Sequence, residues 1–394
     1  MKDAVIVAGV RTAIGSFGGS LSEVSAADLG GLVLAEALKR AHLKPSEVDE
    51  VIMGCIGQIA EDAYIARRCA LKAGLPVSVP ALSVNRLCSS GLQSIVSGAQ
   101  AIASGQANII LAGGTENMSQ YPFLVRKGRW GYRLGHGTLE DSLILALTDP
   151  TLQAHMGVTA ENVAKKYGIS REEQDMFAWD SHRKAISAID EGRFRGQVLP
   201  VQIPQLKGEA KVVDRDEHPR RDTSLEKLSG LKPVFSPEGS VTAGNSSGIN
   251  DGAAAVVLMS EQAARTRGLA EYFRLRSAAA AAVEPSLMGL GPIPSIRKAL
   301  NLAGLELGQV ELIELNEAFA STTLAVIKEL ALPPDKVNVN GGAIALGHPV
   351  GATGCILVVK LMEEMRRRGS RLGMVSLCVG GGQGLTAILE RVVL

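Results

Sequence analysis

An internal repeat limits the possible folds of this 394-residue chain more than any other feature. The spacing of apolar residues in 37–51 recurs 262 positions later, in residues 299–313. The first copy reads Ala37-Leu38-x-x-Ala41-x-Leu43-x-x-x-x-Val48-x-x-Val51, and the second reads Ala299-Leu300-x-x-Ala303-x-Leu305-x-x-x-x-Val310-x-x-Ile313. Each copy predicts the end of a helix, a short loop and a strand. The repeat therefore predicts a duplicated unit with two related halves around a pseudo-twofold axis.

Short apolar strands alternate with amphipathic helices through both halves, which predicts an α/β architecture with buried sheets. Continued at nearly the same shift, the repeat places Cys88 opposite His348, and a helical pattern follows each of them. We expect two related sheets joined face to face across helices. Equivalent loops lie close together near such an axis, so Cys88 and His348 are expected to converge on one site.

The middle of the chain belongs to neither copy of the repeat. We predict an N-terminal half at residues 1–118, completed by about 249–272, a loop domain inserted at 119–248, and a C-terminal half at 273–394. The insertion is expected to bind substrate and to make subunit contacts. Its basic and aromatic run Arg126–Arg133 could contact phosphate or nucleic acid, but we favour a solvated or subunit-contacting surface.

Charge and cysteine usage narrow the class of protein. A formal net charge of +1 argues against a nucleic acid or a membrane surface as a partner chosen by bulk electrostatics. The first apolar run ends at Arg11, too early for a signal peptide, and no stretch approaches a membrane span. Five scattered cysteines without metal-ligand spacing indicate a reducing compartment and no bound metal. We expect a cytoplasmic protein.

Cys88 and His348 are the first candidates for chemistry. Cys88 follows the predicted buried strand Ala81–Val84 and precedes a helical pattern, and a thiol on the first helical turn faces free N–H groups that favour thiolate. Taken alone, Cys88 would more often be a small core residue, as most free cysteines are. His348 lies among small residues in Gly347-His348-Pro349, where an imidazole can act as a base near neutral pH.

Two further junctions carry polar or reactive groups. Cys378 ends an apolar strand and is followed by three glycines, whose backbone N–H groups could point at an oxyanion; a buried cysteine beside a tight turn is the alternative. Asn316 follows the strand pattern 310–315, opposite Gly54 in the repeat. Its amide could hold a water or donate to a carbonyl oxygen, and it could also cap a helix.

Four motifs occur in order: Asn85-x-x-Cys88-x-Ser90-Gly91, Asn316-Glu317-Ala318-Phe319, Gly347-His348-Pro349 and Cys378-x-Gly380-Gly381-Gly382. Together they resemble the thiolase family, and the similarity spans the chain. The resemblance implies a duplicated, five-layered αβαβα fold with a loop domain inserted in the N-terminal half.

The resemblance also implies roles. Cys88 would take the acyl group from one acyl-CoA, His348 would activate it, and Cys378 would move the α-proton of a second acetyl-CoA. Asn316, through a water, and His348 would form one oxyanion hole, and the N–H groups of Cys88 and Gly380 a second. Two sulfurs are needed because one residue cannot carry the acyl group and handle a carbon acid at once.

Positions that resemble the family's coenzyme A contacts lie mostly in the insertion. Ser247 would bond the pantetheine amide, and Arg220 would lie near the adenosine phosphate. The full set is Leu147, His155, Met156, Arg220, Phe235, Ala243, Ser247, Met288, Ala318 and Phe319.

His155-Met156-Gly157 and Met288 look most like short-chain members of the family. This resemblance implies an acetyl-CoA C-acetyltransferase that converts two acetyl-CoA to acetoacetyl-CoA and CoA, reversibly, by a ping-pong mechanism through an acetyl-cysteine. Coenzyme A thioesters would be the substrates, with no metal or redox cofactor, and the assembly a homotetramer built as a dimer of dimers.

Three alternatives to this function are weighed against the residues present. The nearest is a longer-chain 3-ketoacyl-CoA thiolase of fatty-acid degradation, because a few loop side chains set pocket length. A ketoacyl synthase would carry a second His or an Asn where this chain has Cys378. A non-catalytic binder of CoA thioesters would not need the reactive groups that are all present.

Overall fold

Two sheets of matching topology form the framework of the protein. The computed structural model describes residues 3–205 and 208–394; residues 1, 2, 206 and 207, within the predicted N-terminal half and insertion, lie outside the described residues. The first sheet has the order β4-β3-β5-β13-β1 and the second β15-β16-β17-β14, which repeats the order β3-β5-β13-β1. The predicted duplication is confirmed.

The elements of each half follow one another in the same order. The first half contains β1 (Ala4–Thr12), α1 (Ala26–Arg40), β3 (Glu50–Gly54), α2 (Ile65–Lys72), β4 (Ala81–Val84), α3 (Ser90–Ala103), β5 (Ile109–Asn117) and β13 (Asn250–Ser260). The second contains β14 (Glu271–Ala282), α9 (Pro292–Ala303), β15 (Leu312–Leu315), α10 (Ala320–Leu330), α12 (Val350–Arg368), β16 (Leu372–Val379) and β17 (Gln383–Val393).

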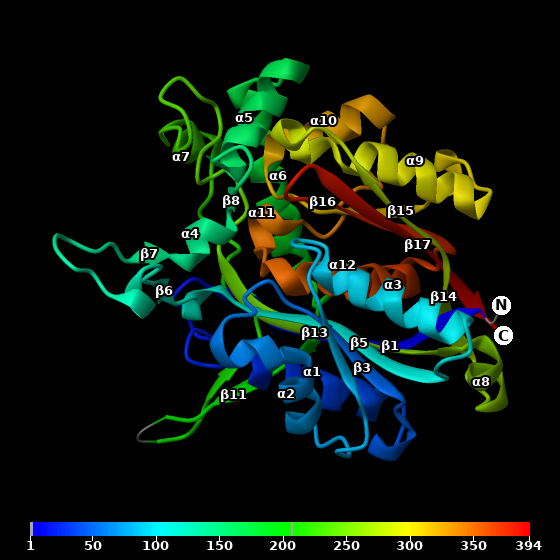
Figure 1. Ribbon diagram of the computed structural model, residues 1–394. Helices are drawn as coiled ribbons and strands as arrows, with labels where there is room; N and C mark the ends of the chain where they lie inside the picture. The colour runs from blue at the N-terminus through cyan, green and yellow to red at the C-terminus, as the bar shows by residue number, and fades with distance from the viewer. Residues whose placement is uncertain (1–2, 206–207) are drawn as a thin grey trace.

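The helices arrange these sheets into five layers. Helices α1 and α2 cover the outer face of the first sheet, and α9 and α10 lie on the outer side of the second (Figure 1). Helices α3 and α12 lie side by side between the sheets and contact strands of both. Their apolar residues, with those of the inner sheet faces, form one large core. The predicted αβαβα order is therefore confirmed.

The junction between the two sheets differs from the expectation that the sheets only face each other. Strands β1 and β14 pair antiparallel, with Val5 opposite Arg274 and Ile6 opposite Phe273, so the two sheets are hydrogen-bonded into one continuous sheet.

The prediction that Ala81–Val84 forms a strand is confirmed, but the prediction that this strand is buried was wrong. This strand, β4, lies at the end of the sheet order, and Leu82 is 46% exposed.

Helices α3 and α12 approach each other closely because glycines face the contact. A Cβ atom on Gly91 would lie 2.9 Å from both Cys355 N and Gly351 O, and a Cβ on Gly354 would lie 2.7 Å from Leu92 Cβ. Side chains at these positions would push the helices apart. The glycines therefore allow the N-terminal turns of both helices to meet.

This contact relates the two predicted reactive residues by the pseudo-twofold axis. Helix α3 begins at Ser90 and α12 at Val350, so Cys88 and His348 each lie two positions before the first residue of an equivalent helix. The structure thus confirms the sequence equivalence of these two positions.

The segment predicted as an insertion contributes helices and short hairpins beside this framework. Its elements include β6 (Phe123–Leu124), β7 (Glu140–Asp141), α4 (Ser142–Ala146), α5 (Met156–Tyr167), α6 (Arg171–Asp190), β11 (Val201–Ile203), β12 (Lys211–Val213) and α7 (Leu225–Ser229). The β6–β7 hairpin projects from the body (Figure 1). The bounds 119–248 stay a prediction. Within the described ranges, no helix combines the length and apolarity required to cross a membrane.

A buried ion pair anchors this segment to the first sheet. Arg11 of β1 is fully buried, and its guanidinium donates to both carboxylate oxygens of Asp216 at 2.6 and 2.9 Å and to Gln197 Oε1 at 2.8 Å. Two parallel N–H···O bonds fix the direction of the pair as well as its distance. Residues far along the chain are thereby held at the end of β1.

We predict that Gly354→Ala destabilises the protein. In most helix interiors a change from Gly to Ala stabilises the helix by about 1 kcal/mol. Here the new Cβ would press on Leu92, so we expect a loss of about 1–3 kcal/mol, as for overpacked cores. Denaturant unfolding followed by circular dichroism measures it. Gly308→Ala is the control, since a Cβ at Gly308 meets nothing within 4 Å. A gain in stability for Gly354→Ala would contradict the close helix contact.

Candidate active site

Cys88 lies in a turn whose shape is set by its own motif residues. Leu87 adopts a left-handed conformation with φ of 45°, which is uncommon for a branched side chain. The turn is held because Asn85 Oδ1 accepts the Leu87 N–H at 2.9 Å. Ser90 Oγ accepts the Arg86 N–H at 2.9 Å and donates to the Leu87 carbonyl at 2.7 Å. Asn85 and Ser90 therefore present Cys88 at the entrance to α3.

The environment of the Cys88 sulfur differs from the prediction. Cys88 precedes the helix by two residues rather than occupying its first turn. Burial raises the pKa of the Cys88 thiol, although the backbone N–H groups of Gly380 and of Cys88 itself, which face the sulfur, lower it. The raised pKa is contrary to the predicted helix-stabilised thiolate. Cys88 is partly exposed, and its thiol needs a base to act as a nucleophile.

His348 is placed as a neutral base. Its Nδ1 lies 2.7 Å from Thr353 Oγ1, and Thr353 donates its own hydroxyl hydrogen to the Pro349 carbonyl at 2.9 Å. Nδ1 must therefore carry the hydrogen, and Nε2 keeps its lone pair. Burial lowers the pKa of His348 to about 4. The backbone N–H of His348 donates to Asn250 Oδ1 at 2.9 Å, which fixes the loop.

Asn316 lies beside this base. Its Nδ2 is 3.4 Å from His348 Nε2, and its backbone N–H donates to Ser376 O at 2.9 Å. The helix-cap alternative is wrong, because α10 begins at Ala320 with Phe319 as its N-cap. Asn316 is buried, and within the described part of the chain its Oδ1 finds no hydrogen-bond partner. Such an oxygen is suited to hold a water or a substrate donor.

Cys378 is the residue before the last in β16 and lies near the Cys88 sulfur. It is buried against Met288, Ala318 and Phe319. Burial and the nearby Cys88 sulfur raise the pKa of its thiol. The alternative of a buried strand-end cysteine is correct as to burial, but Cys378 is also a neighbour of Cys88. The backbone N–H of Gly380, two residues on, faces the Cys88 sulfur.

An apolar cavity opens at Cys88. Gly380, Leu147 and Met156 line it, together with Ile56, Leu87, Met118, Tyr121, Leu143, Ala146 and Val350. Its empty volume is about 360 Å³, including space open to solvent. Two of the predicted coenzyme A positions, Leu147 and Met156, are thus brought to the nucleophile.

Aromatic rings continue the lining away from Cys88. The rings of His155 and Phe235 stack with centroids 4.8 Å apart, and Phe235 meets Phe319 edge-on at 6.1 Å. Burial lowers the pKa of His155, which favours the neutral ring. Ser247 donates its backbone N–H to Ala318 O at 3.0 Å, so it lies beside the Asn316 loop.

Arg220 and Ala243 lie apart from the sulfurs, in a second and more open pocket. Lys227, His182 and His218 also line it. Burial lowers the pKa of both histidines to about 4, so Arg220 and Lys227 carry the positive charge there. The pocket offers cationic groups to an anionic ligand at a distance from the reactive centre.

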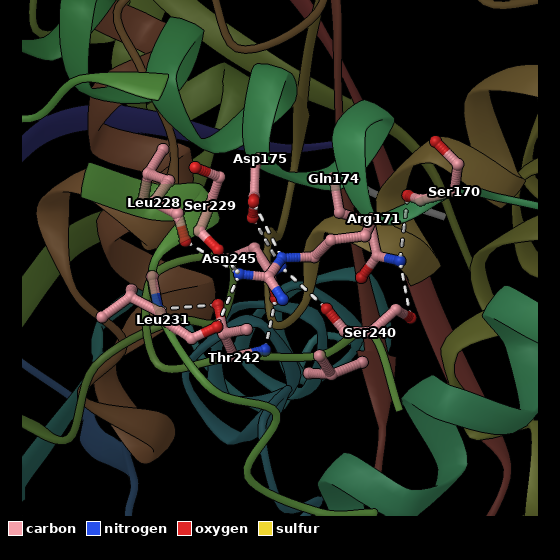
Figure 2. Close-up of polar contacts among 12 residues, drawn as sticks. Ser170, Arg171, Gln174, Asp175, Leu228, Ser229, Leu231, Ser240, Thr242 and Asn245 are labelled. Carbon is pink, nitrogen blue, oxygen red and sulfur yellow. Dashed lines mark hydrogen bonds and ion pairs between the residues drawn. The ribbon is translucent and has the colours of Figure 1, made fainter. Parts of the chain in front are cut away.

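A polar network in the insertion fixes the loop that bears Ala243 and Ser247 (Figure 2). Arg171 donates to Asp175 at 2.8 Å and to the carbonyls of Leu228 and Leu231, each at 2.8 Å. Asn245 Nδ2 donates to the other oxygen of Asp175 at 2.9 Å. The start of α6 thereby holds both α7 and the 240–247 loop, which contribute to the walls of the outer pocket.

Several residues that hold the site were missed by the sequence analysis. Glu317 accepts hydrogen bonds from Ser181 Oγ and Asn338 Nδ2, each at 2.7 Å, and it fixes the loop that carries Asn316. Thr353 sets the tautomer of His348. Glu116 is also buried at this site. A lone acidic residue at the end of an apolar strand was the available signal for Glu116 and Glu317.

The assembled groups define the available chemistry. The Cys88 thiol and the Gly380 backbone line one apolar cavity, with the Cys378 thiol as a neighbour of Cys88 and the His348 imidazole two residues before Val350 of the same lining. This set can deprotonate a nucleophile, bind an oxyanion and move a second proton.

Two family models together match nearly the whole chain. The thiolase N-terminal domain model matches residues 4–262, and the thiolase C-terminal domain model matches residues 269–391.

Individual relatives match over the full length. The chain is 52% identical to an acetyl-CoA acetyltransferase of Pseudomonas aeruginosa, covering 99% of this chain and 100% of that protein. It resembles the crystal structure of the Bacillus anthracis acetyl-CoA acetyltransferase with a TM-score of 0.98 and 47% identity, covering 100% and 99% of the two chains. It also resembles the crystal structure of human mitochondrial 3-ketoacyl-CoA thiolase in complex with CoA, with a TM-score of 0.95 and 44% identity. This match covers 100% of this chain and 98% of the human chain. The chain therefore belongs to the thiolase family and is an acyltransferase.

Proposed function

We propose that the protein is an acetyl-CoA C-acetyltransferase, which joins two acetyl-CoA into acetoacetyl-CoA and CoA and also runs in reverse. The observation that carries the proposal is the small apolar cavity at Cys88, which large side chains such as Met156, Leu147 and Tyr121 close around a short acyl group. The names of the Pseudomonas and Bacillus relatives support the same choice. The alternative is the longer-chain 3-ketoacyl-CoA thiolase activity named for the human protein.

The first half-reaction uses Cys88 and His348. The Cys88 sulfur attacks the carbonyl carbon of acetyl-CoA while its proton passes to His348 Nε2. The N–H groups of Cys88 and Gly380 donate to the oxygen that becomes negative. His348 then returns the proton to the sulfur of the departing CoA. The products are acetylated Cys88 and free CoA, and the imidazole is neutral again.

The second half-reaction uses Cys378. His348 Nε2 first takes the thiol proton of Cys378, and the resulting thiolate removes the α-proton of a second acetyl-CoA, whose carbonyl oxygen is held by Asn316, through a water, and by His348. The carbanion attacks the acetyl group on Cys88, and the released Cys88 sulfur takes the proton from His348, so that both thiols and the imidazole are neutral again.

Coenzyme A would extend from Cys88 to the outer pocket. We infer that its pantetheine runs past Phe235, Phe319 and Ser247, and that Arg220 and Lys227 face the phosphates. No metal or redox cofactor takes part, since proton transfer and thioester exchange need only these side chains.

A cytoplasmic homotetramer, built as a dimer of dimers, completes the proposal. The projecting β6–β7 hairpin exposes Trp130 and Leu134 by 88% and 97%, and Val77, which precedes the edge strand β4, is 81% exposed. Apolar surface of this kind favours contact with another subunit.

We predict that substitution of the two active-site cysteines impairs different steps of the reaction. Cys88→Ser should reduce acetoacetyl-CoA cleavage by about 10³-fold or more and abolish the covalent acetyl-enzyme, because it removes the nucleophile. Cys378→Ser should still acetylate but should form little acetoacetyl-CoA. Mass spectrometry and a spectrophotometric assay measure the two steps. Cys69→Ser, a buried control in α2, should stay active. Full activity of either active-site variant would refute its assigned role.

The cavity predicts a preference for short acyl chains. Thiolysis of 3-ketohexanoyl-CoA should have a kcat/KM more than about tenfold below that of acetoacetyl-CoA, because two added methylenes must displace packed side chains. A coupled assay over the 3-ketoacyl-CoA series provides the comparison. Equal or higher values for the longer chains would favour the 3-ketoacyl-CoA thiolase activity instead.

The raised pKa of Cys88 predicts how its alkylation depends on pH. Below the pKa of a thiol its thiolate fraction rises about tenfold per pH unit, so iodoacetamide should react with Cys88 ever faster from pH 6 to 9. Labelling quenched at a series of times, followed by peptide mapping, gives the alkylation rate of Cys88, and the Cys88→Ser variant gives the background labelling of the other cysteines. A plateau across this range would indicate a preformed thiolate and imidazolium pair, contrary to the neutral His348.

A further inference from the structure

Glu116 is a buried carboxylate that the four motifs do not include. It lies near the end of β5 and is 1% exposed. In the part of the chain that the structure describes, it forms no ion pair with Lys, Arg or His; hydrogen-bond donors surround it instead. A carboxylate buried in this way fixes the groups that donate to it.

Each oxygen of Glu116 joins different segments. Oε1 accepts the Gly57 N–H and the Tyr121 hydroxyl, both at 2.9 Å. Oε2 accepts the Ile56 N–H and the Gly351 N–H, both at 2.9 Å. One side chain therefore ties together the loop after β3, the loop after β5 and the first turn of α12.

Glycines make room for this carboxylate. A Cβ on Gly351 would overlap Glu116 Oε2. A Cβ on Gly57 would lie 3.0 Å from Oε1 and 2.5 Å from the Tyr121 ring. Both positions therefore need glycine for a reason separate from helix packing, namely the close approach of their N–H groups to Glu116.

The tied segments surround the acyl cavity. Ile56, Tyr121 and Val350 line it together with Cys88. Gly351 follows His348 by three residues, at the start of the helix that the His348 loop enters. A shift of any of these segments would change the cavity wall or the direction of the imidazole relative to the thiol.

We propose that Glu116 is a positioning residue for acyl transfer, which holds Tyr121 as a wall of the acyl cavity and holds the start of α12 so that His348 faces Cys88. The inference rests on the proposed function, because it concerns the same acyl group.

Two variants test the two parts of this proposal. Glu116→Gln keeps the size of the side chain, but at least one backbone N–H then faces an amide NH2 whichever way the amide turns. We expect kcat for acetoacetyl-CoA thiolysis to fall about 10- to 100-fold, as for a small misplacement of reacting groups, with KM for CoA changed less than about threefold. The outer pocket at Arg220 has no contact with Glu116, so CoA binding should persist.

Tyr121→Phe removes the hydroxyl bond alone and leaves the ring. With its wall no longer fixed, the cavity should accept a longer chain, so the ratio of kcat/KM for 3-ketohexanoyl-CoA to that for acetoacetyl-CoA should rise about threefold or more. Glu364→Gln is the matched control. Glu364 is a buried carboxylate at the opposite end of α12, where it accepts from Asn340 Nδ2 at 2.9 Å and pairs with Arg367 and Arg368, so the control removes at least as many polar contacts far from the cavity.

The results separate this inference from the proposed function. A wild type that cleaves no 3-ketoacyl-CoA overturns both. An active wild type with a folded Glu116→Gln variant of nearly unchanged kcat, or an equal loss in Glu364→Gln, overturns the inference alone. If Glu116→Gln does not fold, Tyr121→Phe decides: an unchanged chain-length ratio overturns the inference, and a raised ratio supports it.

Discussion

The close contact between the N-terminal turns of α3 and α12 is the constraint on which the site depends. Both helices lie in the central layer, and glycines at their crossing bring backbone to backbone. Because each helix follows a loop with a candidate residue two positions before it, the same contact brings the loops of Cys88 and His348 to one cavity, which Cys88 and Val350 both line. Duplication thus provides two equivalent loops, and divergence of their residues provides a thiol in one and an imidazole in the other.

Burial, rather than the helix terminus, controls the ionisation of the site. It raises the pKa of Cys88 and of Cys378 and lowers that of His348 to about 4, and so favours the uncharged form of all three groups. The N–H groups near the Cys88 sulfur then serve the charged oxygen of the reaction more than a resting thiolate. An uncharged site admits an apolar acyl group at little desolvation cost, and charge appears only as protons move between neighbouring groups.

The sequence predicted the parts of this structure that leave a periodic or repeated trace. The repeat predicted the duplicated layers and the equivalent positions of Cys88 and His348 before α3 and α12, and the glycine-rich junctions pointed to the loops at the site. The pairing of β1 with β14 left no such trace, since edge pairing depends on how whole layers twist and meet. The helix-cap reading of Asn316 failed because local propensity is overridden by the loop that Glu317 fixes. Glu116 was missed because its partners include backbone N–H groups from two distant segments, the loop after β3 and the first turn of α12.

The most direct test of the paired junction is the rate at which Cys88 is acetylated without its base. Rapid-quench acetylation by acetyl-CoA, with peptide mapping, can be compared between the wild type and His348→Asn. Loss of a positioned base should slow acetylation about 10²-fold or more, with the acetyl group still found on Cys88. An unchanged rate, or an acetyl group on another cysteine, would contradict the assignment of Cys88 and His348 as one nucleophile and base pair.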